Sequence, residues 1–298
     1  MLGHHPAKGR KPAMTITVEP LDAPVGARVT GVDLGRALDR TAWAAIHQAW
    51  LEHQVLVFPG QTMGEDDQIR FSLHWGDLPV RTRYAGRREE GRRSHASIML
   101  ISNIRENGEP IGSLPDGEMM FHSDGSYDEH PYRYTTLYAL EVPSRGGDTL
   151  FADMYGAYET LPDDLRRRLA GQRARYGYYA GRDVTPEIKA TLAVGASTDS
   201  WEHPLFTAHE ETGRPVLFAS RLLTQCLVGV PEAESDALLQ RLFDHAERPE
   251  LIYQHVWQPG DYVVWDNRCI NHARTDFPSG ERRLLRRTTV QGVRPDAF

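Results

Sequence analysis

Cysteine is scarce in this sequence, which contains only Cys226 and Cys269 among 298 residues. Two cysteines at this spacing cannot form a disulfide framework or a CxxC zinc site, so we predict a reducing compartment, the cytoplasm. No apolar run approaches the roughly 20 residues of a membrane span, and no membrane partner is expected. Residues 1–14, MLGHHPAKGRKPAM, lack the apolar centre of an export signal, and we predict a disordered N-terminal lead.

Signatures of nucleotide chemistry are also missing. The chain has no GxGxxG or Walker loop, no internal repeat and no low-complexity linker. Its net charge is -7, from 34 basic and 41 acidic residues, so we expect no nucleic-acid partner. The local basic runs AGRREEGRRSH and GERRLLRRTT are by themselves typical of a solvated face.

What the sequence does contain is many short β-type segments with a few helices between them. Helical periodicity covers residues 40–53, 64–77, 153–172 and 231–249. Strands are predicted in 15–34, 54–60, 97–104, 133–142, 147–153, 173–179, 214–220, 251–257, 261–267 and 282–290. We therefore predict a mainly β (α+β) fold, one domain over 15–298, with a jelly-roll core and peripheral helices. The polar, Gly- and Arg-rich stretch 80–119 is predicted to contain a lid loop.

The heptapeptide FHSDGSY places a histidine and an aspartate two positions apart. On a strand, His122 and Asp124 would point to the same face and could bind one metal, although the pattern is also common in ordinary turns. His272, in WDNRCINHAR, offers a third ligand. Two histidines and one carboxylate form the facial triad of non-haem Fe(II) enzymes, and a zinc hydrolase could use the same set.

An arginine-rich strand follows the third candidate ligand. Alternation along GERRLLRRTTV places Arg283, Leu285 and Arg287 on one face, and the residues between them on the other. One face is expected to be solvated. Arginines on the inward face would require anionic partners, whereas surface pairs with glutamates are the simpler reading of either arginine alone.

These segments together resemble the taurine dioxygenase and chlorophenoxyacetate dioxygenase (TauD/TfdA) family. The resemblance extends from about Thr15 to Val293. It is carried, in this order, by GARVTGVDL, VLVFPGQ, FHSDGSY, GGDTLFADMYGAYETLP, WDNRCINHAR and GERRLLRRTTV. The family resemblance implies a double-stranded β-helix, that is, a cupin-like jelly roll, and an enzyme that uses Fe(II), 2-oxoglutarate and O2.

The resemblance also implies roles for single residues. His122, Asp124 and His272 match the iron ligands. Thr149 and Arg283 match the hydroxyl and the guanidinium that hold the distal carboxylate of 2-oxoglutarate.

Further positions match the walls of the family's cavity. Trp265 matches an aromatic lining residue, and Arg287 matches a position that meets the substrate's anionic head or lies near the cosubstrate. Arg81 and Glu118 differ in chemistry from the taurine pattern, which argues against taurine itself. The full set expected to contact substrate is Arg287, Tyr84, Arg81, Glu118 and, as an apolar wall, Phe121.

The expected activity is hydroxylation of a small organic anion, such as an aryloxyalkanoate, a sulfonate or a related carboxylate. The reaction would be coupled to conversion of 2-oxoglutarate to succinate and CO2. The alternatives are hydroxylation, desaturation or cyclisation of a natural-product or amino-acid precursor, and a cupin-like binding protein without catalysis. A homo-oligomer, dimer or tetramer, is expected.

Overall fold

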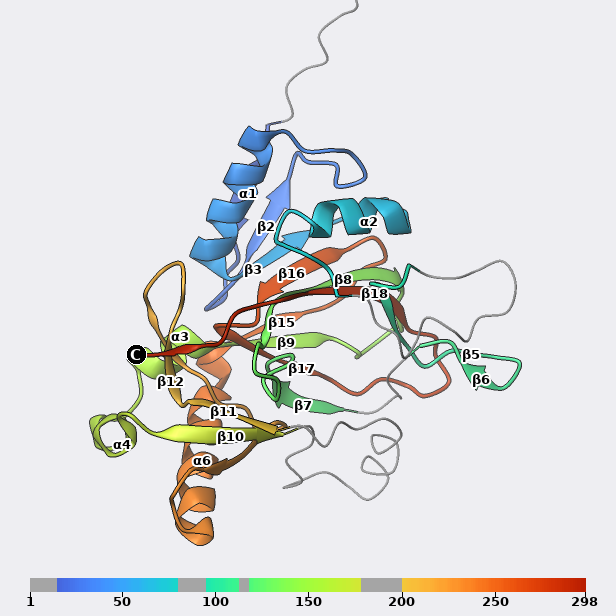
Figure 1. Ribbon diagram of the computed structural model, residues 1–298. Coiled ribbons are helices and arrows are strands. Elements are labelled where there is room, and N and C mark those ends of the chain that lie inside the picture. Colours follow the sequence, from blue (N-terminus) through green and yellow to red (C-terminus); the bar gives the residue numbers. More distant parts are fainter. Residues whose placement is uncertain (1–14, 80–94, 113–117, 178–199) are drawn as a thin grey trace, which may run out of the picture.

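Two mainly antiparallel sheets packed face to face form the centre of the molecule (Figure 1). The computed structural model describes residues 15–79, 95–112, 118–177 and 200–298. The predicted N-terminal lead and half of the stretch predicted to contain a lid, residues 80–94 and 113–117, lie outside these ranges. The described part of 80–119 includes the edge strand Met99–Ser102 of the larger sheet, and the lid stays a prediction.

The larger sheet has seven strands. All neighbours are antiparallel except one parallel pair near its N-terminal edge. In spatial order the strands are β1 (Thr17–Pro20), β2 (Ala27–Thr30), β3 (Val55–Phe58), β16 (Tyr262–Asp266), β8 (Tyr132–Glu141), β18 (Leu284–Gln291) and β4 (Met99–Ser102).

The second sheet has four strands and carries most of the chemistry described below. In order they are β15 (Ile252–His255), β9 (Thr149–Asp153), β17 (Ile270–Arg274) and β7 (Met119–His122). Three small sheets flank it: β11 (Ser200–Pro204), β10 (Arg173–Gly177) and β14 (Thr224–Leu227); β13 (Pro215–Leu217), β12 (Phe206–Ala208) and β19 (Asp296–Ala297); and the hairpin β5 (Arg105–Glu106) and β6 (Glu109–Pro110).

The helices lie outside the sheets, as predicted. They are α1 (Arg40–His53), α2 (Glu65–Ser72), α3 (Met154–Glu159), α4 (Asp163–Leu169) and α6 (Glu232–Ala246), with the 3-10 turn η1 (Pro249–Leu251). Asp39 caps α1 by accepting a 2.8 Å hydrogen bond from the backbone N–H of Ala42. The single helix predicted over 153–172 was wrong. Pro162 disfavours helical geometry at the residue before it, and the chain forms two short helices instead.

The apolar core has two parts separated by the larger sheet. Strand β16 shows the division: Val263 and Trp265 belong to the cluster on the side of the second sheet, whereas Tyr262 and Val264 pack beneath α1 and α2. Each face of this strand is therefore buried, which explains its continuous run of apolar and aromatic residues.

Strand β18 is also buried on both faces, which contradicts the expectation that one face is solvated. Arg286, on the face opposite Arg287, is only 6% exposed because α2 crosses it. Its guanidinium donates to the carbonyl of Met63 and lies 4.8 Å from the ring of Tyr138. Of the four arginines in residues 282–287, Arg282 is the one that is exposed. It precedes the strand and forms an ion pair with Glu141.

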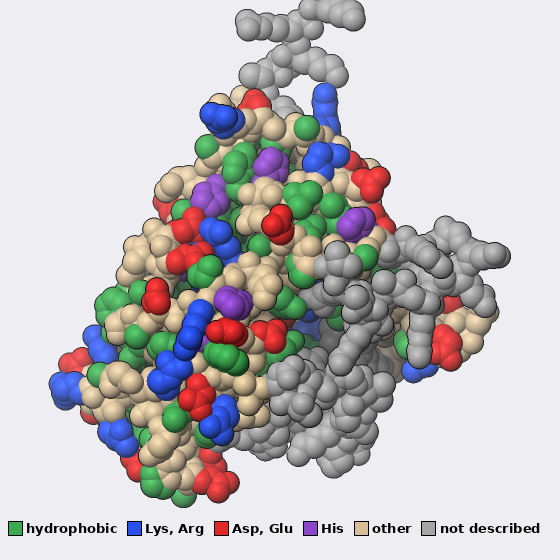
Figure 2. Space-filling view, viewed as in Figure 1, with side chains coloured by type: hydrophobic (Ala, Val, Ile, Leu, Met, Phe, Trp, Pro, Cys, Tyr) green, Lys and Arg blue, Asp and Glu red, His purple; other side chains and the backbone are tan. Residues whose placement is uncertain are grey.

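Charges on the visible surface are mixed. Figure 2 shows acidic and basic side chains interspersed with apolar ones on this face. Ion pairs between α4 and α6 are an example: Arg241 and Asp164 approach to 3.2 Å, and Arg168 and Glu234 to 2.5 Å. Exposed pairs of this kind contribute little stability, so the fold depends on the apolar core.

Leu56→Ala should lower the free energy of unfolding by about 2–5 kcal/mol, because the side chain is fully buried between the larger sheet and the helices. Leu73→Ala is the matched control, since Leu73 is 50% exposed and its removal should change stability by less than about 0.5 kcal/mol. Urea titration followed by circular dichroism measures both, and equal losses would contradict this assignment of the core.

Candidate active site

Two histidines meet on neighbouring strands of the second sheet. His122 is the last residue of β7, and His272 lies at the centre of β17. The strand register pairs them directly, and their ring centroids are 4.1 Å apart. Residues 150 positions apart in the sequence are thus brought together by the antiparallel pairing of two strands.

Asp124 completes the cluster from a turn, and not from the strand that the sequence reading assumed. The strand ends at His122, and the backbone carbonyl of Asp124 accepts a 3.2 Å bond from the N–H of Tyr132 at the start of β8. The carboxylate lies 3.8 Å from the Nε2 atom of each histidine. Turn geometry therefore achieves the convergence that strand alternation was expected to give.

The three side chains are in the protonation states that a divalent metal requires. Burial lowers the pKa of both His122 and His272, so both imidazoles are neutral at pH 7. The Nδ1 atom of His122 lies 2.9 Å from the carbonyl of Met120, which leaves Nε2 as the ligand atom. All three ligand atoms lie within 4.8 Å of one another, so the residues could hold a metal ion.

Arg287 is close to this cluster and forms an ion pair with it. One terminal nitrogen of its guanidinium is 2.8 Å from Oδ1 of Asp124. Burial acts to raise the pKa of Asp124, but the charge of Arg287, together with the two histidines, outweighs burial and lowers that pKa. The Nε atom of Arg287 is buried and has no hydrogen-bond partner among the described residues. Arg287 thus combines a protein carboxylate partner with donors still available to a ligand.

Arg283 immediately precedes β18, on the same side of this segment as Arg287, and is 2% exposed. It donates from Nη2 to the carbonyl of Gly147 at 3.1 Å, while its buried Nε has no partner among the described residues. Burial, with a smaller contribution from the charge of Arg274, lowers the pKa of Arg283 to about 9. A buried guanidinium beside a second arginine favours binding of an anion.

Thr149 begins β9 near these arginines and pairs in register with Arg274. Its hydroxyl accepts a 3.0 Å hydrogen bond from the indole N–H of Trp257. Because an indole can only donate, the hydroxyl proton of Thr149 is free to donate elsewhere. Trp257 and Arg274 were missed at the sequence level. Arg274 lies two residues after His272 in the sequence, and this short separation is the signal that could have placed it near the site. Trp257 is more distant in the sequence and gave no comparable signal.

The remaining predicted residues are placed as follows. Trp265 lies against His272, with ring centroids 4.7 Å apart. Phe121 precedes His122 on β7, so alternation directs it to the opposite face, which makes it a poor candidate for contact with a substrate at the metal. Glu118 is exposed beside the strand. Arg81 and Tyr84 lie outside the described residues.

A second group of potential ligands, His209, Asp266 and Cys269, is also buried. Here Arg268 holds the carboxylate of Asp266 through both oxygens, at 2.7 and 2.8 Å. His209 bonds the same carboxylate at 3.0 Å. Both oxygens of this carboxylate are therefore bonded by protein groups, and the residues form an internal network of hydrogen bonds and ion pairs.

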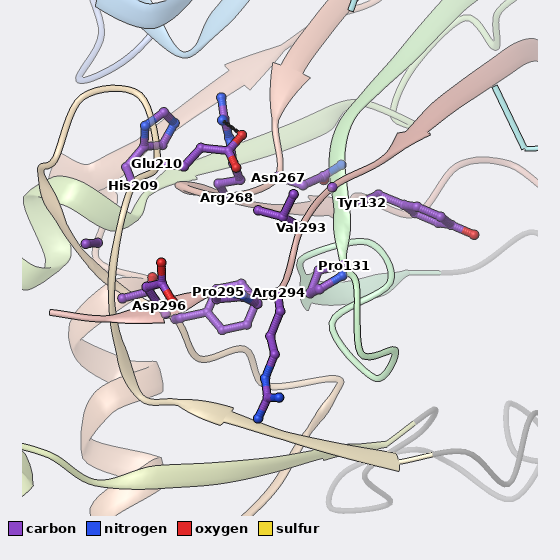
Figure 3. Close-up of a pocket in the computed structure, with 14 residues that line it drawn as sticks. Pro131, Tyr132, His209, Glu210, Asn267, Arg268, Val293, Arg294, Pro295 and Asp296 are labelled. Atoms are coloured by element: carbon purple, nitrogen blue, oxygen red, sulfur yellow. Dashed lines mark hydrogen bonds and ion pairs between the residues drawn. The ribbon is translucent and has the colours of Figure 1, made fainter. Parts of the chain in front are cut away.

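A pocket is present elsewhere in the described part of the chain (Figure 3). Its labelled residues come from the start of β8, from the turn after β16, from His209 and Glu210, and from the C-terminal segment around Arg294. None of the three candidate ligands lines it, although Asn267 does. This pocket is therefore distinct from the metal-type site.

Comparison with known proteins agrees with this geometry. The family model described as taurine catabolism dioxygenase TauD, TfdA family matches residues 17–289. The chain is 38% identical over 293 residues to pentalenolactone F synthase of Streptomyces avermitilis, covering 93% of this chain and 94% of that protein. It is 34% identical over 285 residues to the alpha-ketoglutarate-dependent 2,4-dichlorophenoxyacetate dioxygenase of Cupriavidus pinatubonensis, covering 93% and 98%.

A solved structure provides a comparison of the fold. AAD-2 in complex with Mn(II) and N-oxalylglycine superposes with a TM-score of 0.76 at 26% identity, covering 95% of this chain and 99% of that one. This match over nearly the whole of both chains, together with the mainly β architecture described above, confirms the predicted fold class. Among the described residues, no helix is both long enough and apolar enough to span a membrane.

Proposed function

Because the chain belongs to the TauD, TfdA family of dioxygenases, we propose that it oxidises a small organic anion beside a metal held by His122, Asp124 and His272. The protein is an Fe(II)- and 2-oxoglutarate-dependent dioxygenase. The observation that carries the proposal is a buried cluster of two neutral imidazoles and one carboxylate, together with two guanidinium groups: that of Arg283, which is buried, and that of Arg287, which contacts the carboxylate.

The metal ligands fit Fe(II) by number, type and charge. Two neutral imidazoles and one carboxylate would supply three ligands to such a metal, which would leave further coordination positions for small ligands. When bound, iron supplies the oxidising chemistry that uses O2 and 2-oxoglutarate and yields succinate and CO2. The protein's own part is to bind and orient the reactants and to keep water out.

Arg283 is proposed to hold the distal carboxylate of 2-oxoglutarate. Its unpaired Nε and the free hydroxyl proton of Thr149 are two donors that an incoming carboxylate would satisfy. Gly147 leaves room for the side chain of Arg283, because a Cβ atom added to residue 147 would lie only 3.1 Å from Nε of Arg283. The charge of Arg274 nearby would add to the attraction. Trp265 is proposed as an aromatic wall of the same cavity, because it packs on His272.

Arg287 is proposed to bind the anionic head of the substrate with its remaining donors, close to the metal. This supports an aryloxyalkanoate, sulfonate or related carboxylate as the substrate, with oxidation at the carbon near the acidic group. Tyr84, Arg81 and Glu118 remain proposals for the opposite wall of the substrate site.

A second substrate class is supported by the similarity to a pentalenolactone F synthase, at 38% identity. We propose as the alternative a natural-product or amino-acid precursor that is hydroxylated, desaturated or cyclised by the same centre. A panel of aryloxyalkanoates, alkylsulfonates, amino acids and natural-product precursors, assayed for succinate release, separates the two. Substrate-stimulated succinate from none of them would count against both proposed classes.

Arg287→Gln should abolish the preference for an anionic substrate over its neutral amide. Losing a charge-assisted pair of this kind costs on the order of 2–5 kcal/mol, so wild type should favour the acid by roughly thirtyfold or more. The acid-to-amide ratio of kcat/KM is measured within each variant, at saturating metal, so that any effect on Asp124 cancels. A wild-type enzyme that accepts both equally would contradict anion recognition.

We also propose a homo-oligomer, dimer or tetramer, as the family resemblance implies, and a cytoplasmic location. Light scattering after size exclusion measures the former directly, and a monomer mass would contradict it.

A further inference from the structure

A chain of buried side-chain hydrogen bonds ends on the carboxylate of Asp124. It begins at Trp265, whose indole N–H donates to Oδ1 of Asn267 at 3.0 Å. Asn267 donates from Nδ2 to the hydroxyl of Thr135 at 2.8 Å, and Thr135 donates to Oδ2 of Asp124 at 2.6 Å. All four residues are buried, so water does not compete for these bonds.

The direction of every bond in the chain is fixed by chemistry. The indole of Trp265 can only donate, which orients the amide of Asn267 with its oxygen toward the indole and its nitrogen toward Thr135. Thr135 has one hydroxyl proton, and since it accepts from Asn267 it gives that proton to Asp124. An ionised carboxylate can only accept, so the chain ends at the metal ligand.

The same residues connect the parts of the fold that carry the other two ligands. Asn267 lies in the turn between β16 and β17, where the chain passes from the larger sheet to the second sheet. Its backbone carbonyl accepts a 2.7 Å bond from Ser123, the residue between His122 and Asp124. Trp265 also packs its ring on His272. The network therefore touches both segments that supply ligands.

Each oxygen of the Asp124 carboxylate has a different neighbour. Oδ2 accepts from Thr135 and lies 3.8 Å from Nε2 of His272, while Oδ1 lies 3.8 Å from Nε2 of His122 and 2.8 Å from Arg287. Proceeding from the ligand set proposed above, we infer that Thr135 and Asn267 are positioning residues, which hold the carboxylate of Asp124 in the orientation that directs one oxygen toward each histidine. Rotation of the carboxylate out of this orientation would break the bond to Thr135.

The test measures binding of Co(II) to the metal-free protein, by calorimetry and by the visible absorption of the bound ion. Thr135→Val removes the donor at nearly constant volume and should weaken Co(II) binding by roughly ten- to a hundredfold, with an altered spectrum. Thr135→Ser restores the hydroxyl and should bind Co(II) within about threefold of wild type. Asn267→Ala should weaken binding in the same direction, because it removes the orienting donor.

Thr136→Val is the matched control. Thr136 is the next residue on β8, is equally buried, and bonds the hydroxyl of Thr288 at 2.7 Å on the opposite face of the sheet. It should lose stability without a change in Co(II) affinity or spectrum. If Thr135→Val and Thr136→Val bind Co(II) alike, the positioning role is overturned while the ligand set stands. If Asp124→Ala binds Co(II) as wild type does, the proposed ligand set itself fails.

Discussion

Asp124→Ala should reduce metal affinity and metal-dependent turnover by more than about a hundredfold. Loss of a hydrogen-bond partner of a ligand commonly costs ten- to a hundredfold, and loss of the ligand itself should cost more. The remaining imidazoles of His122 and His272 are neutral, so the site would also lose the one negative charge that compensates a divalent cation. Calorimetric titration with Fe(II) under anaerobic conditions, and succinate release with substrate, measure the two effects.

Removal of this carboxylate also leaves Arg287 without its observed ion-pair partner. Asp124→Asn is therefore a useful companion, because it keeps the shape and an acceptor for Thr135 while it removes the charge. Glu129→Gln is the control, since Glu129 lies near the surface and only approaches Arg294, at 3.9 Å. Asp124→Ala with wild-type turnover and a native circular dichroism spectrum would rule out this carboxylate as a ligand.

Arg283→Leu should raise the 2-oxoglutarate concentration for half-maximal rate by roughly thirtyfold or more. This corresponds to about 2–5 kcal/mol for truncating one partner of a buried charged pair. Burial lowers the pKa of Arg283 only to about 9, so the guanidinium is still a cation at pH 7. It is poorly compensated by protein groups, and an arriving carboxylate relieves this. Iron affinity, measured separately, should change little.

The neighbouring arginine provides a strict comparison. Arg282→Leu removes the same side chain one position earlier, where it is exposed and bonded to Glu141, and should leave the 2-oxoglutarate dependence unchanged. Arg283→Lys keeps the charge without the planar fork and should fall between wild type and leucine. Equal 2-oxoglutarate dependence of Arg283→Leu and Arg282→Leu would show that another group holds the cosubstrate.

Much of the fold could be predicted because local patterns determine it. The apolar spacing of residues 40–53 predicts α1 with the same bounds that the structure shows. The strands β3 and β16 fall inside predicted segments, and β8 and β18 each extend one residue beyond theirs. The least successful predictions concern which helices and strands pack over a given strand. Nothing within the segment Leu284–Gln291 reports that α2 lies over its outer face, so Arg286 was not recognised as a buried residue.

The types of ligand and the cation of the candidate site were likewise readable from sequence. His122, Asp124 and His272 stood out by residue type within segments of strand-like or turn-like character, whereas Arg283 was singled out by the family resemblance. Whether Arg287 faced a substrate or a protein acid was left open, and it lies against Asp124. The relevant distance joins two elements 163 positions apart, and no local pattern encodes it.

The sequence by itself determined which chemistry this protein can host, because imidazole, carboxylate and guanidinium groups are properties of residues and because strand periodicity follows from single segments. Only the tertiary structure decided how these groups are held. The pairing of β7 with β17 sets the distance between the histidines, and Asn267, in the turn after β16, links Trp265 and Thr135 of the larger sheet, the latter bonded to Asp124. Burial lowers the pKa of both histidines, and the charge of Arg287 helps to lower the pKa of Asp124. These are consequences of contacts between distant segments, and such contacts exist only once both sheets have packed.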